Sequence, residues 1–78
     1  MIEIRLFAYL PDICRSRQRQ VSVPYREGLT VRDLLEMEDI AEEDLAIMVN
    51  DKHASPDAPI RDGDSVFFLP AIAGGAPG

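Results

Sequence analysis

The sequence contains few of the residues that build metal centres, disulfides and catalytic sites. Its single cysteine, Cys14, cannot form an internal disulfide and cannot by itself hold zinc or an iron–sulfur cluster. Its single histidine, His53, has no nucleophile motif beside it. No apolar run is long enough to cross a membrane, and the chain starts on a strand-like pattern instead of a signal peptide. These absences favour a cytoplasmic protein that is not an enzyme, binds no metal or cofactor of its own and has no membrane partner.

Basic residues are also scarce. The chain carries 8 lysine and arginine residues against 14 acidic residues, which gives a formal net charge of −6. Because nucleic-acid affinity depends largely on neutralising phosphates, this balance argues against a nucleic-acid partner and favours a partner with a basic surface. The one basic cluster, Arg15, Arg17 and Arg19, is expected in an exposed loop, and Cys14 is expected to be an ordinary cysteine of that loop.

Apolar alternation predicts the secondary structure of one small domain. Pro11 ends the first strand and a polar loop follows it. Thr30 is a good helix N-cap, with Asp33 as the acid of a capping box, and a short amphipathic helix extends to about Glu38. Strands are predicted over residues 1–9, 20–25, 46–49 and 65–69, with at most a short strand within 53–60. Residues 46–49 are apolar throughout, so they are expected to be well buried.

The order strand, strand, helix, strand, short strand, strand is that of the β-grasp, or ubiquitin-like, fold. We therefore predict an α+β domain with a mixed sheet of four to five strands and one main helix packed on one face. The first and last strands should lie side by side in parallel. The predicted domain covers residues 1–73, and residues 74–78 form a flexible C-terminal tail.

Strand periodicity also predicts an apolar cluster on the face that the helix leaves open. If Val66 and Phe68 point toward the helix, Phe67, Leu69 and Phe7 point away from it. Soluble proteins rarely expose such a cluster without a use for it, so we predict a docking surface. The alternative is that the loop containing Ile13 folds over the cluster and covers it.

The chain ends in small residues after the last strand. Ile72, Ala73, Gly74 and Gly75 form a segment that could enter a narrow channel of a partner enzyme, because glycine lacks a Cβ. The alternative is an ordinary frayed terminus.

These features together resemble the MoaD/ThiS sulfur-carrier family, which includes the small subunits of molybdopterin synthase. The similarity covers essentially the whole chain. It rests on the end of the first strand, the start of the helix, Val49-Asn50, and the C-terminal segment Asp62-Gly63-Asp64-Ser65-Val66-Phe67-Phe68-Leu69-Pro70-Ala71-Ile72-Ala73-Gly74-Gly75. The resemblance implies a carrier that has no active site of its own.

The resemblance also implies the chemistry and the partners. An adenylating enzyme related to ubiquitin activators, using ATP and Mg, would activate the carboxylate of Gly75, and sulfur would then convert it to a thiocarboxylate. A sulfur acceptor such as the large subunit of molybdopterin synthase would receive the sulfur for molybdopterin or its tungsten analogue. Thiamin and cysteine biosynthesis are alternative destinations. Phe7 and Leu69 match positions that dock partner proteins in the family.

The sequence departs from the family pattern after the Gly-Gly pair. Ala76, Pro77 and Gly78 follow it, so the carboxylate of Gly75 is held in a peptide bond. We expect a protease to remove this extension. The alternatives are a ubiquitin-like modifier joined to other proteins through Gly75, a non-covalent β-grasp interaction module, and activation of Gly78 itself.

Overall fold

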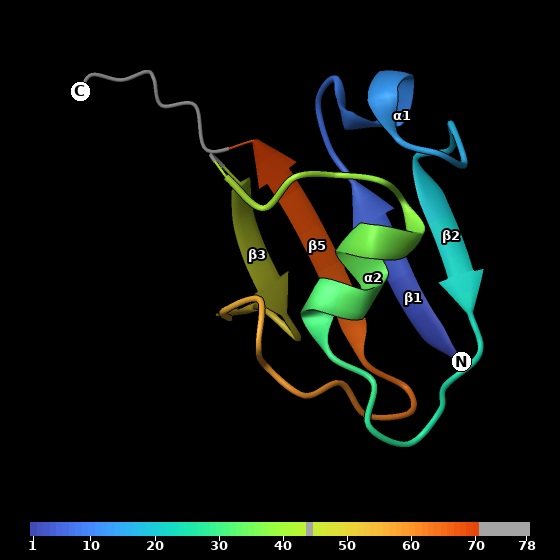
Figure 1. Ribbon diagram of the computed structural model, residues 1–78, viewed down its shortest axis with the longest axis vertical. Coiled ribbons are helices and arrows are strands. Elements are labelled where there is room, and N and C mark those ends of the chain that lie inside the picture. The colour runs from blue at the N-terminus through green and yellow to red at the C-terminus, as the bar shows by residue number, and fades with distance from the viewer. Residues whose placement is uncertain (44, 71–78) are drawn as a thin grey trace.

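The computed structural model describes residues 1–43 and 45–70, which form a five-stranded sheet with one main helix packed on one face (Figure 1). The strand order is β2-β1-β5-β3-β4, in which β1 and β5 are parallel and the other neighbours are antiparallel. The predicted α+β β-grasp fold is therefore confirmed. The elements in chain order are β1 (Ile2–Leu6), α1 (Leu10–Ile13), β2 (Gln20–Val23), α2 (Val31–Met37), β3 (Leu45–Val49), β4 (Lys52–His53) and β5 (Ser65–Pro70).

The core lies between α2 and the two central strands. Apolar residues at alternate positions of β1 and β5 are fully buried, because period-two alternation turns them all toward the helix. Helix α2 contributes three buried residues at positions i, i+3 and i+4, which lie on one face of a helix. These eight buried residues are Ile2, Ile4, Leu6, Val31, Leu34, Leu35, Val66 and Phe68.

A capping box starts α2 where the sequence predicts it. The Thr30 hydroxyl accepts a hydrogen bond from the main-chain N–H of Asp33 at 3.4 Å, and the Asp33 carboxylate accepts one from the N–H of Thr30 at 3.0 Å. Two N–H groups that lack partners within the helix are thereby satisfied. The helix ends at Met37, with Glu38 as its C-cap.

The segment after β1 differs from the prediction. Leu10–Ile13 forms the short helix α1 instead of a loop, because a proline in the first turn of a helix needs no N–H partner. The helical turn brings Cys14 into the core, where only 1% of it is exposed, and its N–H donates to the Leu10 carbonyl at 2.9 Å. The prediction that Cys14 is an ordinary loop cysteine was wrong.

The basic loop after α1 is tied to the end of α2 by Glu38. The Glu38 carbonyl accepts a hydrogen bond from the N–H of Arg15, and its carboxylate accepts one from the N–H of Ser16, both at 2.9 Å. Glu38 is buried, whereas the side chains of Arg15, Arg17 and Arg19 are exposed, as the sequence predicts. The main chain of this loop is thus fixed while its charges face solvent.

Candidate functional site

The candidate site lies on the sheet face opposite α2, which we call the open face. Phe67 and Leu69 alternate along β5 with fully buried residues and are partly exposed on this face. Phe7 follows the buried Leu6 at the end of β1 and is also partly exposed. The structure therefore places all three predicted docking residues on the same face, and we call Phe7, Phe67 and Leu69 the apolar patch.

The parallel pairing of β1 and β5 brings the patch residues together. The ring centroids of Phe7 and Phe67 are 5.4 Å apart, and the rings are tilted by 53°. That geometry is favourable for an aromatic pair. Ile13, which could have covered the patch, is itself 58% exposed, and the three patch residues remain partly exposed.

The patch extends onto β3, which the sequence did not indicate. Of the β3 residues only Ile47 is buried and the others are partly exposed, so the expectation that residues 46–49 are well buried holds for Ile47 alone. Register explains the difference: Met48 lies opposite Phe67, and Ala46 lies opposite Leu69, so both share the open face. The sequence analysis did not predict that β3 pairs with β5. That pairing would have identified Met48 and Ala46 as residues of the open face.

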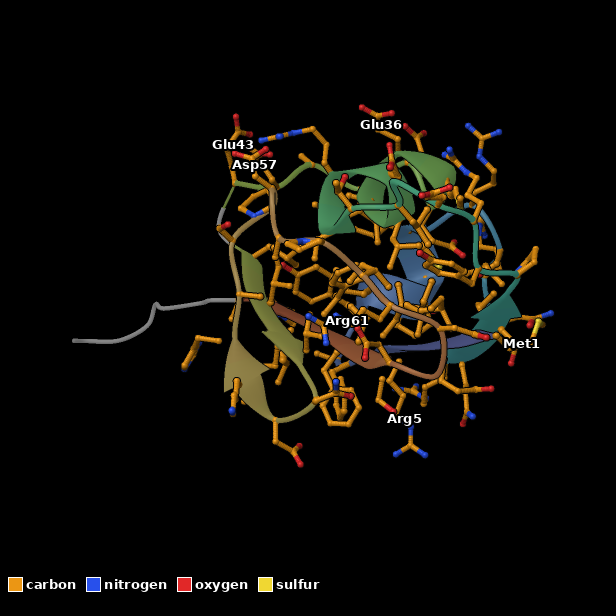
Figure 2. All side chains as sticks on the ribbon, turned by 90° about the horizontal axis from the view of Figure 1, so that it is seen from below. Met1, Arg5, Glu36, Glu43, Asp57 and Arg61 are labelled. Carbon is orange, nitrogen blue, oxygen red and sulfur yellow. The ribbon has the colours of Figure 1, made fainter. Side chains whose placement is uncertain are left out.

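A polar region adjoins the patch on the open face. A pocket of about 230 Å³ lies between Glu3, Arg5, Gln20, Ser65 and Phe67. Figure 2 shows Arg5 pointing away from the sheet on the side opposite Glu36 of α2. Phe67 therefore belongs to both the patch and the pocket wall, which makes the open face one surface with an apolar end and a polar end.

Glu3 supplies a fixed negative charge at the polar end. Its carboxylate accepts hydrogen bonds from the Ser22 hydroxyl at 2.7 Å and from the Gln20 amide at 3.1 Å. These two hydrogen bonds, that from Ser22 first, lower the pKa of Glu3 below its ordinary value. The open face thus carries an ionised carboxylate beside the Arg5 guanidinium at neutral pH.

The predicted reactive segment is outside the described residues. β5 ends at Pro70, which lies opposite Leu45 in the register of β3. The predicted threading segment, the activation site Gly75 and the extension to be removed all follow it and lie beyond residue 70. Their roles remain predictions, as does the domain boundary at residue 73. These residues are Ile72, Ala73, Gly74, Gly75, Ala76, Pro77 and Gly78.

The acidic turn before β5 has a structural role. The Asp64 carboxylate accepts hydrogen bonds from the main-chain N–H of Arg61 and from the Asn50 side chain, both at 2.8 Å, and Asp62 pairs with the N-terminal ammonium group. Within residues 1–43 and 45–70 there is no group of three acidic, histidine or cysteine side chains that could hold a metal ion. The same residues include no helix with the length and apolar composition needed to cross a membrane.

Comparison with solved structures supports the fold. The chain is similar to the crystal structure of SAMP1 from Haloferax volcanii, with 21% identity, coverage of 95% and 98% of the two chains, and a TM-score of 0.73. A putative molybdopterin converting factor, subunit 1, from Pyrococcus furiosus gives 23% identity, coverage of 91% and 97%, and a TM-score of 0.72. A chain of the Amycolatopsis orientalis BexX/CysO complex gives 22% identity, coverage of 96% and 100%, and a TM-score of 0.67.

The family comparison covers nearly the whole sequence. The model of the ThiS family matches residues 4–75, which include β1, α2, β5 and the Gly-Gly pair. That match ends on Gly75 and leaves Ala76 outside. The chain therefore belongs to the ThiS family and has the ubiquitin-like β-grasp fold of small, generally non-catalytic sulfur carriers.

Proposed function

We propose that this protein carries sulfur as a thiocarboxylate on Gly75 and delivers it to an acceptor enzyme in the synthesis of a sulfur-containing cofactor. The pathway we favour is that of molybdopterin or its tungsten analogue. The observation that carries the proposal is the apolar patch, which lies on β5 and at the end of β1, because β5 is the strand that leads toward Gly75. A partner enzyme that binds the patch therefore binds next to the start of the C-terminal segment that contains Gly75, the residue on which the enzyme would act.

The family and fold comparisons support this proposal. The family match ends on Gly75, the residue whose carboxylate we propose to be activated. One structural relative is described as a putative molybdopterin converting factor subunit, and another comes from the BexX/CysO complex. Both are relatives in fold, and the description of the first motivates the choice of pathway.

The proposed chemistry takes place in the active site of an adenylating enzyme. The Gly75 carboxylate attacks the α-phosphorus of Mg-bound ATP, and pyrophosphate leaves. The resulting acyl adenylate is a far better acyl donor than the carboxylate, so one difficult step becomes two easier ones. The terminal sulfur of an enzyme persulfide then attacks the acyl carbon, forms a C–S bond and displaces AMP. A thiol next cleaves the S–S bond inherited from the persulfide, which gives a disulfide and leaves the thiocarboxylate on Gly75. The absence of a side chain on Gly75 reduces crowding around the attacked carbon.

The peptide bond between Gly75 and Ala76 must be hydrolysed before this sequence can begin, because an amide has no carboxylate to adenylate. We therefore propose that a protease removes Ala76, Pro77 and Gly78. Pro77 fixes its own backbone φ and has no N–H donor, which would hinder passage of the extended segment through a narrow channel. The extension thus keeps the precursor inactive.

A second candidate function is conjugation to other proteins as a ubiquitin-like modifier through Gly75. The observation that favours it is the fold similarity to proteins described as SAMP1 and as small archaeal modifier protein 1. Both functions share the activation step. Isopeptide adducts between Gly75 and lysine side chains of other proteins would identify the modifier.

The intact mass of the protein from its native cell tests the lead proposal. We expect a species that ends at Gly75 with one carboxylate oxygen replaced by sulfur. Growth conditions that repress synthesis of the cofactor provide the control, because the modified fraction should then decrease. If only the full-length, unmodified chain is present while the cofactor is being made, the chain is instead a non-covalent interaction module.

The role of the patch is tested by Phe7→Asp in a binding assay with the adenylating enzyme. A charge beside Phe67 should weaken binding at least about 30-fold, since central aromatic anchors contribute about 2 kcal/mol or more to an interface. Ile13→Asp is the matched control, because Ile13 is an exposed apolar residue outside the patch. Equal affinities of the two variants would show that the enzyme docks elsewhere.

A further inference from the structure

The outer edge of β2 is a second surface of this molecule that the proposed function does not use. β2 is the terminal strand of the sheet and pairs only with β1 among the described elements (Figure 1). An edge strand presents a row of main-chain N–H and C=O groups that a further strand can bind. The orientation of these groups follows from the register.

The register shows which groups of β2 face outward. Leu6 lies opposite Arg19, and its N–H donates to the Arg19 carbonyl at 2.8 Å. In an antiparallel pair, residues that exchange hydrogen bonds alternate with residues that do not, so Val21 is the next inward-bonding position. Gln20 and Ser22 therefore direct their N–H and C=O groups away from the sheet, and both residues are exposed.

The side chains beside this edge differ between the two faces of the sheet. Val21 and Val23 are partly buried and pack against the core on the α2 side. Gln20 and Ser22 lie on the open face together with Glu3, to which both donate hydrogen bonds. A strand added at this edge would place every second side chain beside the two valines, and aliphatic residues fit those positions.

Charge distinguishes this edge from the rest of the molecule. Arg15, Arg17 and Arg19 immediately precede β2 and are exposed, and none forms an ion pair with a carboxylate of the described residues. Arg26 and Arg32 are ion-paired. The other exposed basic side chains with no ion pair among the described residues, Arg5, Lys52 and Arg61, are not clustered in the sequence. An uncompensated basic cluster in a chain of net charge −6 is complementary to an acidic segment at this edge.

We propose that the β2 edge binds an extended segment of a partner protein in which an acidic run adjoins alternating aliphatic residues. The segment adds a strand to the sheet: its main chain pairs with Gln20 and Ser22, and its acidic run lies beside Arg17 and Arg19. β1 separates β2 from β5, so this surface is distinct from the apolar patch. A second copy of this chain is a poorer occupant, because residues 20–25 contain no carboxylate to place opposite the arginines.

Two blocked synthetic peptides, in which three acidic residues precede or follow alternating valine and threonine, serve as probes for parallel and antiparallel addition in NMR titrations of the full-length protein. We expect the largest shifts at the amide groups of Gln20 and Ser22. The double variant Arg17→Glu/Arg19→Glu should reduce the affinity at least about tenfold, since several exposed charge pairs together contribute about 1.4 kcal/mol. A peptide with lysines in place of the acidic residues is the matched control and should not bind.

Ser22→Pro provides an independent test of strand addition. Ser22 lies opposite Glu3 at a position whose N–H faces solvent and makes no hydrogen bond to β1. Proline there should leave the sheet intact while the peptide loses a hydrogen-bond donor. Ser22→Ala removes the hydroxyl and keeps the N–H, and should bind as the unmodified protein does. If Ser22→Pro does not fold, the arginine variant alone decides the outcome.

Four results would overturn the proposal. The first is no binding at millimolar peptide, and the second is a set of shifts centred on Phe7 and Phe67 instead of on β2. The third is self-association through β2 without peptide. The fourth is binding of a single-stranded oligonucleotide as tight as that of the peptide, because the arginines would then be recognising phosphate.

Discussion

At the scale of single residues, one step along β5 separates core from surface. Val66 and Phe68 are fully buried, whereas Phe67 between them is partly exposed on the open face. The difference comes only from the alternation of side chains along a strand. Phe68 therefore packs in the core, whereas its neighbour Phe67 contacts Phe7 on the surface of the sheet.

This difference predicts different costs of truncation. Phe68→Ala should lower the free energy of unfolding by about 3–5 kcal/mol, because it leaves a cavity between the sheet and α2. Phe67→Ala should lower it by about 1 kcal/mol, mainly through loss of the ring contact with Phe7. Urea denaturation of both variants measures the two values. Equal costs would mean that Phe67 contributes to the core.

The Glu3 carboxylate offers a second test at this scale. Ser22→Ala removes the first of its two hydrogen bonds, so the pKa of Glu3 should rise toward its ordinary value. Because the folded-state pKa is lowered, the ionised carboxylate stabilises the fold above the ordinary glutamate pKa. That contribution is lost as the pH falls through the folded-state pKa.

An NMR titration of the Glu3 side-chain carboxyl carbon measures the change. Ser55→Ala, an exposed serine outside the β1–β2 pair, is the control and should leave the Glu3 pKa where it is. A Glu3 pKa that does not respond to Ser22→Ala would show that the hydroxyl does not hold the carboxylate in solution.

At the scale of elements, the start of α2 depends on Thr30. Thr30→Ala should destabilise the protein by about 1 kcal/mol, because the Asp33 N–H loses its side-chain acceptor. Thr30→Ser keeps a hydroxyl at the same place and should cost much less. Thermal unfolding followed by circular dichroism distinguishes them, and equal melting temperatures would contradict a role for the cap.

The same scale shows what the sequence can and cannot predict. The long elements were predicted, because period-two alternation and a capping box are local signals that survive folding. α1 was not, since its four residues are too few to establish a helical period. Phe7, Phe67 and Leu69 were placed by alternation alone, but Met48 required the pairing of β3 with β5, which is a long-range property.

At the scale of the whole molecule, the fold depends on pairing between its most distant strands. β1 and β5 lie at the centre of the sheet, and together they supply five of the fully buried core residues, Ile2, Ile4, Leu6, Val66 and Phe68. A fragment that ends at residue 64 lacks β5 and should therefore be unfolded. The core cannot be assembled from the remaining strands alone.

If the domain ends at residue 73, removal of residues 74–78 should leave its stability unchanged. A chain ending at residue 73 keeps β5 intact, so its free energy of unfolding should agree with that of the full chain within about 0.5 kcal/mol. Urea denaturation of the two chains is the measurement. A larger loss of stability would show that residues 74–78 pack against the domain and are not a separate tail.

The parallel pairing of β1 and β5 also determines how the molecule responds to mechanical force. The N-terminal end of β1 and the C-terminal end of β5 lie at opposite ends of the sheet (Figure 1). Tension applied across these two ends slides one strand along the other and loads all the hydrogen bonds between them together. If the two strands were antiparallel, the same tension would instead break the hydrogen bonds between them one after another. We therefore expect slow forced unfolding, which would delay a motor-driven protease that pulls on one end while the other end is held.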